Sequence, residues 1–156
     1  MDSQDEAQLV TIDAPKVYRA MKFDPTDSLP IVGSGSSSEL GARPGVDVSV
    51  DAAGLVMLDS TGMSVAPNWR DLDFTRIPRR LRHLVPGATG GNRTACFTMG
   101  SGPFARGDFA EGLELIPDEE PAPIKHGVVA PRRVARFDQY LSDLASTRAR
   151  WRIDET

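Results

Sequence analysis

The sequence predicts a single α+β domain over residues 1–156, with an antiparallel-rich β-sheet and few helices. Its 156 residues, 40% of them hydrophobic, suffice for one core. The 14 glycines and 12 prolines, against 6% aromatic residues, indicate many turns and short elements. Strand patterns fill the first three quarters of the chain, and the one strong helical periodicity comes last.

Two strands are predicted near the N-terminus, Gln8–Ile12 and Lys16–Phe23, with a proline break between them. Arg19 lies inside the second strand. Because side chains alternate along a strand, Arg19 shares a face with the apolar Val17 and Met21. A charge in that position needs a partner.

The middle of the chain predicts a short helix and a hairpin. Ser36 and Glu39 stand at capping-box spacing, which favours a short helix there. The apolar runs Val46–Val50 and Leu55–Leu58, separated by a short turn, are typical of a hairpin. This hairpin leads into the polar run Asp59–Ser64.

The next stretch predicts a short helix, two strands and a long loop. The helix begins at Pro78 and ends before Pro86, with arginines on its outer face. Thr94–Met99 and Leu113–Ile116 have strand patterns, and Gly100–Gly112 between them has the character of a loop. Loops of this length are often functional.

The last quarter predicts one more strand and the main helix. Ile124–Pro131 has a strand pattern, with His126 at its beginning. Apolar residues then recur at the spacing of an amphipathic helix that packs on a core. These residues are Val134, Phe137, Leu141, Leu144 and Trp151.

Several classes of protein are excluded by composition. The single Cys96 cannot close an intramolecular disulfide, and no spacing fits a zinc site. Asp71 and Asp73 could together hold a divalent ion, but two neighbouring carboxylates without further ligands usually face solvent, so no metal is expected. The acidic segment Met1–Glu6 lacks the features of a secretory signal, and no apolar run reaches about 18 residues. We expect a protein that avoids membranes and acts in the cytoplasm of the producer or target cell, delivered without a cleaved signal peptide.

Arginine dominates the basic residues, at 15 of 18, although the formal net charge is −4. The planar guanidinium group can bind two oxygens of a phosphate or carboxylate at once. A solvated surface is nevertheless the commoner explanation of clustered arginines. The arginines concentrate in two groups: Arg76, Arg79, Arg80 and Arg82, and then Arg132, Arg133, Arg136, Arg148, Arg150 and Arg152.

Four segments together resemble a known family. They are Val17–Ala20, Gly54 to Ser64 with its Thr61-Gly-Met-Ser64 turn, His126–Pro131, and the C-terminal Leu141–Trp151. In this order they resemble the short type VI secretion effectors of bacteria, with related fungal domains, whose fold is like that of ADP-ribosyltransferase toxins. The resemblance implies a split β-sheet in which residues from the first, a middle and a late strand meet.

The resemblance implies a catalytic set of Arg19, Ser64 and His126, with NAD as the substrate. Arg19 would hold the pyrophosphate of NAD bidentately. Short polar side chains at Ser60, Thr61 and Ser64 would serve the ribose. Cleavage of the nicotinamide–ribose bond builds positive charge on the sugar, and a group that stabilises this charge accelerates the step.

Two aromatic residues, Tyr18 and Trp69, are candidates for stacking on nicotinamide or adenine, with a core role as the equal alternative. One departure from the family pattern concerns the late Glu-x-Glu motif of many transferases. The sequence has none and carries His126 instead. A histidine stabilises an oxocarbenium less well than a carboxylate, so either the acceptor chemistry differs or NAD binds without rapid turnover.

The resemblance therefore predicts an antibacterial toxin and enzyme, an NAD-dependent glycosyltransferase that transfers ADP-ribose to an intracellular target or hydrolyses NAD. A cognate immunity protein is a further expected partner. Two alternatives stay open: a non-enzymatic toxin that binds through its C-terminal helix and the loop with Phe104 and Phe109, or a nucleic-acid-binding module that uses the arginine clusters. The negative net charge and the lack of a basic-aromatic motif make nucleic acid the less expected partner.

Overall fold

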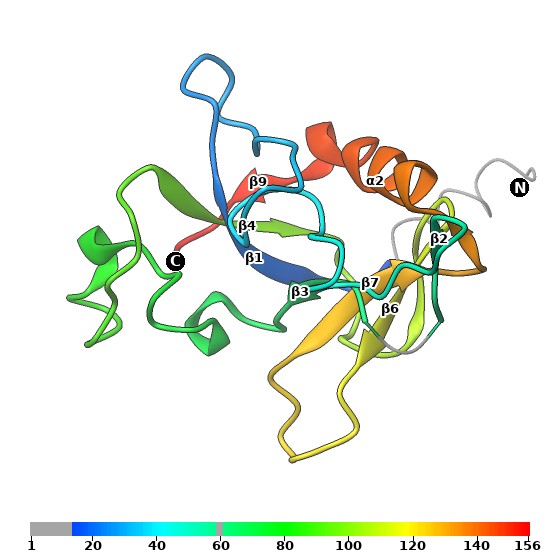
Figure 1. Ribbon diagram of the computed structural model, residues 1–156. Coiled ribbons are helices and arrows are strands. Elements are labelled where there is room, and N and C mark those ends of the chain that lie inside the picture. Colours follow the sequence, from blue (N-terminus) through cyan, green and yellow to red (C-terminus); the bar gives the residue numbers. More distant parts are fainter. Residues whose placement is uncertain (1–13, 59–60) are drawn as a thin grey trace, which may run out of the picture.

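A computed structural model describes residues 14–58 and 61–156 of the chain. Antiparallel strands form most of it, and its one α-helix among these residues is α2, Phe137–Ala145 (Figure 1). The strands are β1 Val17–Lys22, β2 Leu55–Val56, β3 Met63–Val65, β4 Thr94–Met99, β5 Gly107–Ala110, β6 Leu113–Pro117, β7 Gly127–Pro131, β8 Ala135–Arg136 and β9 Arg152–Ile153. Three 3₁₀ turns are η1 Trp69–Asp71, η2 Arg79–Leu81 and η3 Arg148–Arg150.

Two antiparallel sheets meet at one pair of residues. One sheet has the strand order β1-β4-β9 and the other β3-β7-β6-β5, while β2 and β8 form a separate short ladder. Tyr18 of β1 and Ala66, next to β3, join the sheets through backbone hydrogen bonds of 2.7 and 2.9 Å. The predicted α+β class with an antiparallel-rich sheet is confirmed, and Arg19 follows directly after this junction.

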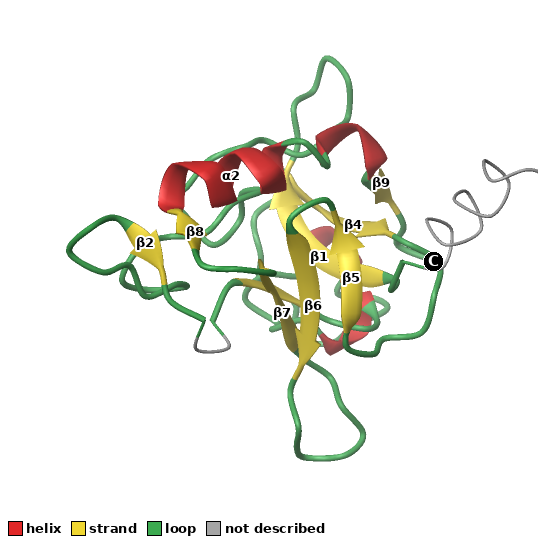
Figure 2. Ribbon diagram, turned by 90° about the vertical axis from the view of Figure 1, so that its right-hand side faces the viewer, coloured by secondary structure: helices red, strands yellow, loops and turns green. Residues whose placement is uncertain are grey.

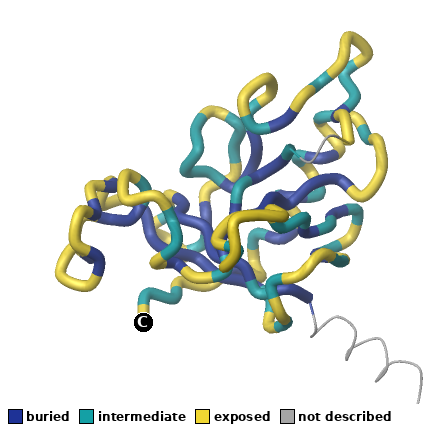
Figure 3. The backbone as a smooth tube through the Cα atoms, turned by 90° about the horizontal axis from the view of Figure 1, so that it is seen from below, coloured by how far each residue is buried: buried dark blue, intermediate teal, exposed yellow. Residues whose placement is uncertain are grey.

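The main core lies between the sheets and α2. Figure 2 shows α2 lying across the top of the strands, and Figure 3 shows that the buried residues follow the strands while the projecting loops are exposed. All six residues of β4 are buried, because both of its faces are covered. The largest core side chains are Phe97, Phe109, Met63, Leu113, Leu115, Tyr140 and Trp151.

A second core cluster lies beneath the segment 68–93, which carries η1 and η2. This segment projects to the left in Figures 1 and 3. Beneath it the buried residues are Tyr18, Trp69, Ile77, Leu81, Val85, Ala88 and Cys96. The C-terminal residues close this cluster: Glu155 pairs with Arg80 at 2.7 Å and accepts a 3.1 Å bond from the amide of Cys96.

The helix is shorter than the apolar stripe predicted. Val134 is 52% exposed and precedes the helix, whereas Trp151 is buried but follows it. Hydroxyl groups explain the early end. Ser146 Oγ and Thr147 Oγ1 donate to the carbonyls of Asp143 and Leu144 at 2.6 and 2.7 Å, so they compete with continued helical bonding. Among the described helices, none has the length and apolarity needed to span a bilayer.

Other predicted elements differ in detail. Residues 36–39 form a turn rather than a helix, because the Glu39 carboxylate accepts a bond from the Gly35 amide, outside the segment. The hairpin predicted from Val46–Val50 and Leu55–Leu58 is formed in part. Val50 bridges Val56, and the Asp51 and Met57 amides donate to the Leu55 and Ser49 carbonyls, each at 2.9 Å, while the ladder of β2 is made with β8. The long loop predicted at Gly100–Gly112 contains β5.

Around Pro78 the predicted helix is reduced to η2 and a following turn. The strand β9 was not predicted, as its two residues carry no periodic pattern. The strands predicted at Lys16–Phe23, Thr94–Met99 and Leu113–Ile116 are confirmed as β1, β4 and β6. The strand predicted at Gln8–Ile12 lies outside the described residues.

Replacing Tyr140 with Phe tests the tie between α2 and the second sheet. Its buried hydroxyl donates to the Val129 carbonyl at 2.5 Å and accepts from the Met63 amide at 3.0 Å. Loss of both bonds inside the core should lower the free energy of unfolding by about 1–3 kcal/mol in urea titrations. Ser142→Ala, on the exposed side of the same helix, is the control and should cost less than about 0.5 kcal/mol. Equal losses in the two variants would contradict this role.

Cys96 reports on closure of the second core cluster. Burial raises the pKa of its thiol to about 12, so the thiol stays protonated near neutral pH and should react slowly with a disulfide reagent. Glu155→Ala removes the partner of both Arg80 and the Cys96 amide, and we expect faster labelling. Glu111→Ala, at an exposed position, is the control. If the native thiol of the parent protein reacts as fast as in urea, the cluster is open.

Candidate functional site

A cleft of about 340 Å³ lies where the two sheets meet. Its wall is formed by β1, by β3, by the end of η1 with the segment after it, and by the residues just before β7. The lining residues are Arg19, Ala20, Ser64, Val65, Ala66, Asp71, Leu72, Asp73, Arg76, Lys125 and His126. Arg19, Ser64 and His126, which the sequence predicts as a catalytic set, are thus brought together.

Arg19 is 3% exposed and ties three segments to one another. Its Nη2 donates to the carbonyls of Ser37 and Glu39, each at 2.9 Å. Its Nε donates to Glu39 as well, at 3.2 Å, and its Nη1 donates to the Ser64 carbonyl at 2.8 Å. Burial, and then the charge of Arg76, lower the pKa of Arg19 to about 10.

This geometry corrects the pyrophosphate role predicted for Arg19. A guanidinium has five N–H donors, and four hydrogen bonds already engage Arg19. A bidentate phosphate contact would require some of them to break. The guanidinium instead satisfies main-chain carbonyls that would otherwise be buried without donors, which is a structural role at the wall of the cleft.

Ser64 faces the cleft because of strand alternation. Its neighbours Met63 and Val65 are buried in β3, and Ser64 between them is only partly covered. The backbone carbonyl of Ser64 accepts a hydrogen bond from Arg19, and Ser64 is one of the residues that line the cleft. The backbone at Gly62 approaches β7 closely, since a Cβ there would lie 2.4 Å from the Val129 carbonyl oxygen. This close approach fixes the position of the backbone two residues before Ser64.

His126 forms a pair with Asp118 that sequence reasoning missed. The two residues face each other across the hairpin between β6 and β7, and His126 Nδ1 lies 3.0 Å from both carboxylate oxygens. The Asp118 amide also donates to the His126 carbonyl at 2.9 Å. With the proton on Nδ1 held by the carboxylate, Nε2 is left as an acceptor.

Charged side chains that were not predicted for the site line the same cleft. Arg76 and Lys125 add positive charge, and Asp71 and Asp73 add negative charge. Hydrogen bonds from Thr75, from both its hydroxyl and its amide, lower the pKa of Asp73. Among residues 14–58 and 61–156, no group of three His, Cys, Asp or Glu side chains could hold a metal ion.

Three of the described residues predicted for NAD binding, Tyr18, Thr61 and Trp69, do not line this cleft. Tyr18 and Trp69 are 7% and 1% exposed and belong to the second core cluster, so their rings do not face a ligand. Their polar atoms bond to Asp154 and to the Thr156 carbonyl, at 2.8 and 3.1 Å. Thr61 lines a different pocket, and Ser60 lies outside the described residues.

Comparison with known proteins gives no match: no protein-family model, curated protein or solved structure matches the chain. The geometry of the cleft is therefore the basis on which its chemistry can be judged.

Arg19→Lys tests the structural role of the guanidinium. The ammonium group keeps the charge but cannot reach the carbonyls of Ser37, Glu39 and Ser64 together, so the free energy of unfolding should fall by about 3 kcal/mol. Urea titration measures the loss. The control is Arg43→Lys, in the more exposed pair with Asp47, which should cost at most about 1 kcal/mol. Equal stability of the Arg19 variant and the parent would contradict the role.

Proposed function

We propose that the chain is a cytosol-acting toxin that binds NAD in this cleft and transfers ADP-ribose to an intracellular target or hydrolyses NAD. The observation that carries the proposal is the meeting of Arg19, Ser64 and His126 in one cleft at the junction of two sheets. These residues come from three segments, in the order that the effector family implies. The cleft volume of about 340 Å³ is within the usual range for small ligands, about 300–1,000 Å³.

The charges of the cleft suit an anionic ligand at one part of its wall. Because the donors of Arg19 are engaged, the phosphates of NAD would bind to Arg76 and Lys125 instead. Neither of these side chains forms an ion pair with a described residue. Both are thus available for charge-assisted bonds to phosphate oxygens.

The pair of His126 and Asp118 suits the proton transfer that the reaction needs. In hydrolysis the bond between nicotinamide and the ribose C1′ breaks, nicotinamide leaves with the electron pair, and a water oxygen bonds to C1′. His126 Nε2 takes the proton of that water, or of an acceptor hydroxyl in transfer, and Asp118 steadies the imidazolium. The products are ADP-ribose, nicotinamide and one proton.

A carboxylate in the cleft could stabilise the positive charge that develops on the ribose. Positive charge develops on the ribose, and no Glu-x-Glu motif is present to stabilise it. Asp71 and Asp73 both line the cleft, and the hydrogen bonds from Thr75 favour the ionised form of Asp73. A toxin of this kind needs a cognate immunity protein in its producer, so we include one in the proposal.

His126→Ala tests the proposal in a bacterial host induced to express the protein. Expression of the parent should arrest growth, with loss of cellular NAD or with ADP-ribosylated products. His126→Ala should lower the rate by about 10²–10⁴-fold because the proton acceptor is gone. Asp118→Asn should have a smaller effect, since Nε2 remains. His83→Ala is the matched control, because His83 is the other histidine and lies outside the cleft.

Purified protein separates binding from chemistry. Titration calorimetry should show NAD binding by the parent and by His126→Ala alike, with weaker binding when Arg76 or Lys125 is replaced by Ala. If the parent binds no NAD, and growth arrest persists in His126→Ala with cellular NAD unchanged, a non-enzymatic toxin replaces the proposed enzyme.

A further inference from the structure

The segment 68–93, called the arginine lobe below, has a charge opposite to that of the protein. It contains six arginines against two aspartates, within a chain of net charge −4. The rest of the chain is therefore more acidic than the whole, and the lobe carries a local excess of positive charge. Such separation creates a local positive potential that net charge conceals.

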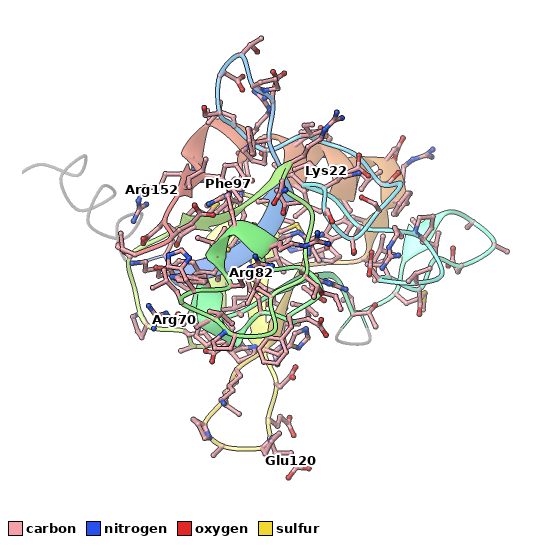
Figure 4. All side chains as sticks on the ribbon, turned by 90° about the vertical axis from the view of Figure 1, so that its left-hand side faces the viewer. Lys22, Arg70, Arg82, Phe97, Glu120 and Arg152 are labelled. Atoms are coloured by element: carbon pink, nitrogen blue, oxygen red, sulfur yellow. The ribbon has the colours of Figure 1, made fainter. Side chains whose placement is uncertain are left out.

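The arginines of the lobe are exposed, apart from Arg76, which is partly buried. Arg70, Arg79 and Arg82 form no ion pair with a described residue. Figure 4, which faces this side of the molecule, shows Arg70 and Arg82 over the lobe. Arg80 is different, because it pairs with Glu155 and anchors the lobe to the C-terminal residues.

The lobe is an ordered surface. Backbone hydrogen bonds close it, from Thr89 to Phe74 at 2.9 Å and from Gly90 to Ile77 at 2.7 Å. Its underside is the second core cluster, which buries Ile77 and Leu81. A ligand would meet a backbone already in place, so the ordering cost of binding falls on the arginine side chains alone.

The same segment carries an exposed aromatic ring. Phe74 is 54% exposed, and its ring lies beside Gly87, where a Cβ would be 3.5 Å from the Phe74 Cδ2 atom. Phe74 is followed after one residue by Arg76, which lines the cleft. Exposed arginines with an exposed ring are the combination that binds single-stranded nucleic acid, through phosphate contacts and base stacking.

We propose that the arginine lobe binds single-stranded nucleic acid, with a base stacked on Phe74 and phosphates on Arg79 and Arg82. The strand would reach the mouth of the cleft at Arg76. An acidic protein would also be attracted by the charge, but the guanidinium fork matches phosphate oxygens, and the isolated ring suits a base better than a broad apolar contact. This surface does not depend on NAD chemistry.

Fluorescence anisotropy with a labelled uridine oligonucleotide of about 12 residues, without NAD, tests the proposal. The parent should bind, and raising salt from about 50 to about 200 mM should weaken binding steeply. Arg79→Ala with Arg82→Ala should reduce the salt slope by about 1.4, because two phosphate contacts at about 0.7 each on a single strand are lost. Phe74→Leu keeps an apolar side chain beside Gly87 but cannot stack a base, so affinity should fall at least about 5-fold.

Arg133→Ala with Arg136→Ala is the control, because it removes the same number of exposed arginines away from the lobe; Arg136 lies in β8 and pairs with Asp138 at 3.3 Å. It should leave affinity and slope near the parent values, and thermal unfolding should confirm that every variant folds. The same assay with a thymidine DNA oligonucleotide tells which sugar is preferred. The proposal is overturned if the parent does not bind either oligonucleotide, if the control weakens binding as much, or if polyglutamate competes equally and Phe74→Leu has no effect. The last result would indicate an acidic protein partner.

Discussion

The buried guanidinium of Arg19 is the constraint on which the rest of the structure depends. Its side chain extends from β1, next to the pair of Tyr18 and Ala66 that joins the two sheets, and bonds to β3 and to the turn at 37–39. Without it, three part-buried carbonyl oxygens would lose a charged donor, and of the polar contacts between the two sheets the backbone bonds of Tyr18 and Ala66 would remain. The same contacts shape the wall of the cleft, so the stability of the fold and the form of the site have a common origin.

The parts of the fold that were predictable are those set by local pattern. β1, β4 and β6 have β-branched and apolar residues over four to six positions, and their strands lie where the pattern indicates. Elements decided by distant contacts were not predictable. β2 keeps backbone contacts of the expected hairpin and also pairs with β8, about 80 residues later in the chain. The helix stops where Thr147 turns its hydroxyl back to Leu144.

The site was predictable in part, for a similar reason. Strand alternation places Arg19 among apolar neighbours and so requires a partner for it, but the partners are carbonyls of a turn whose shape the sequence does not reveal. Asp118 could have been found from the pairing of Pro117 with Gly127, which sets residues 118 and 126 opposite each other. The charge of the arginine lobe was visible in the sequence, whereas the exposure of Phe74 depends on how the lobe folds.

The shielded thiol of Cys96 has a practical consequence for spectroscopy. Because it is the single cysteine of the sequence and is fully buried in β4, a cysteine introduced on the surface would carry a dye or spin label without competition from the native residue. Exposed positions on either side of the cleft, such as Glu120 in the hairpin and Arg82 in the arginine lobe, would then allow the distance between these two projections to be followed in solution. The protein thus needs no cysteine removed before such labelling.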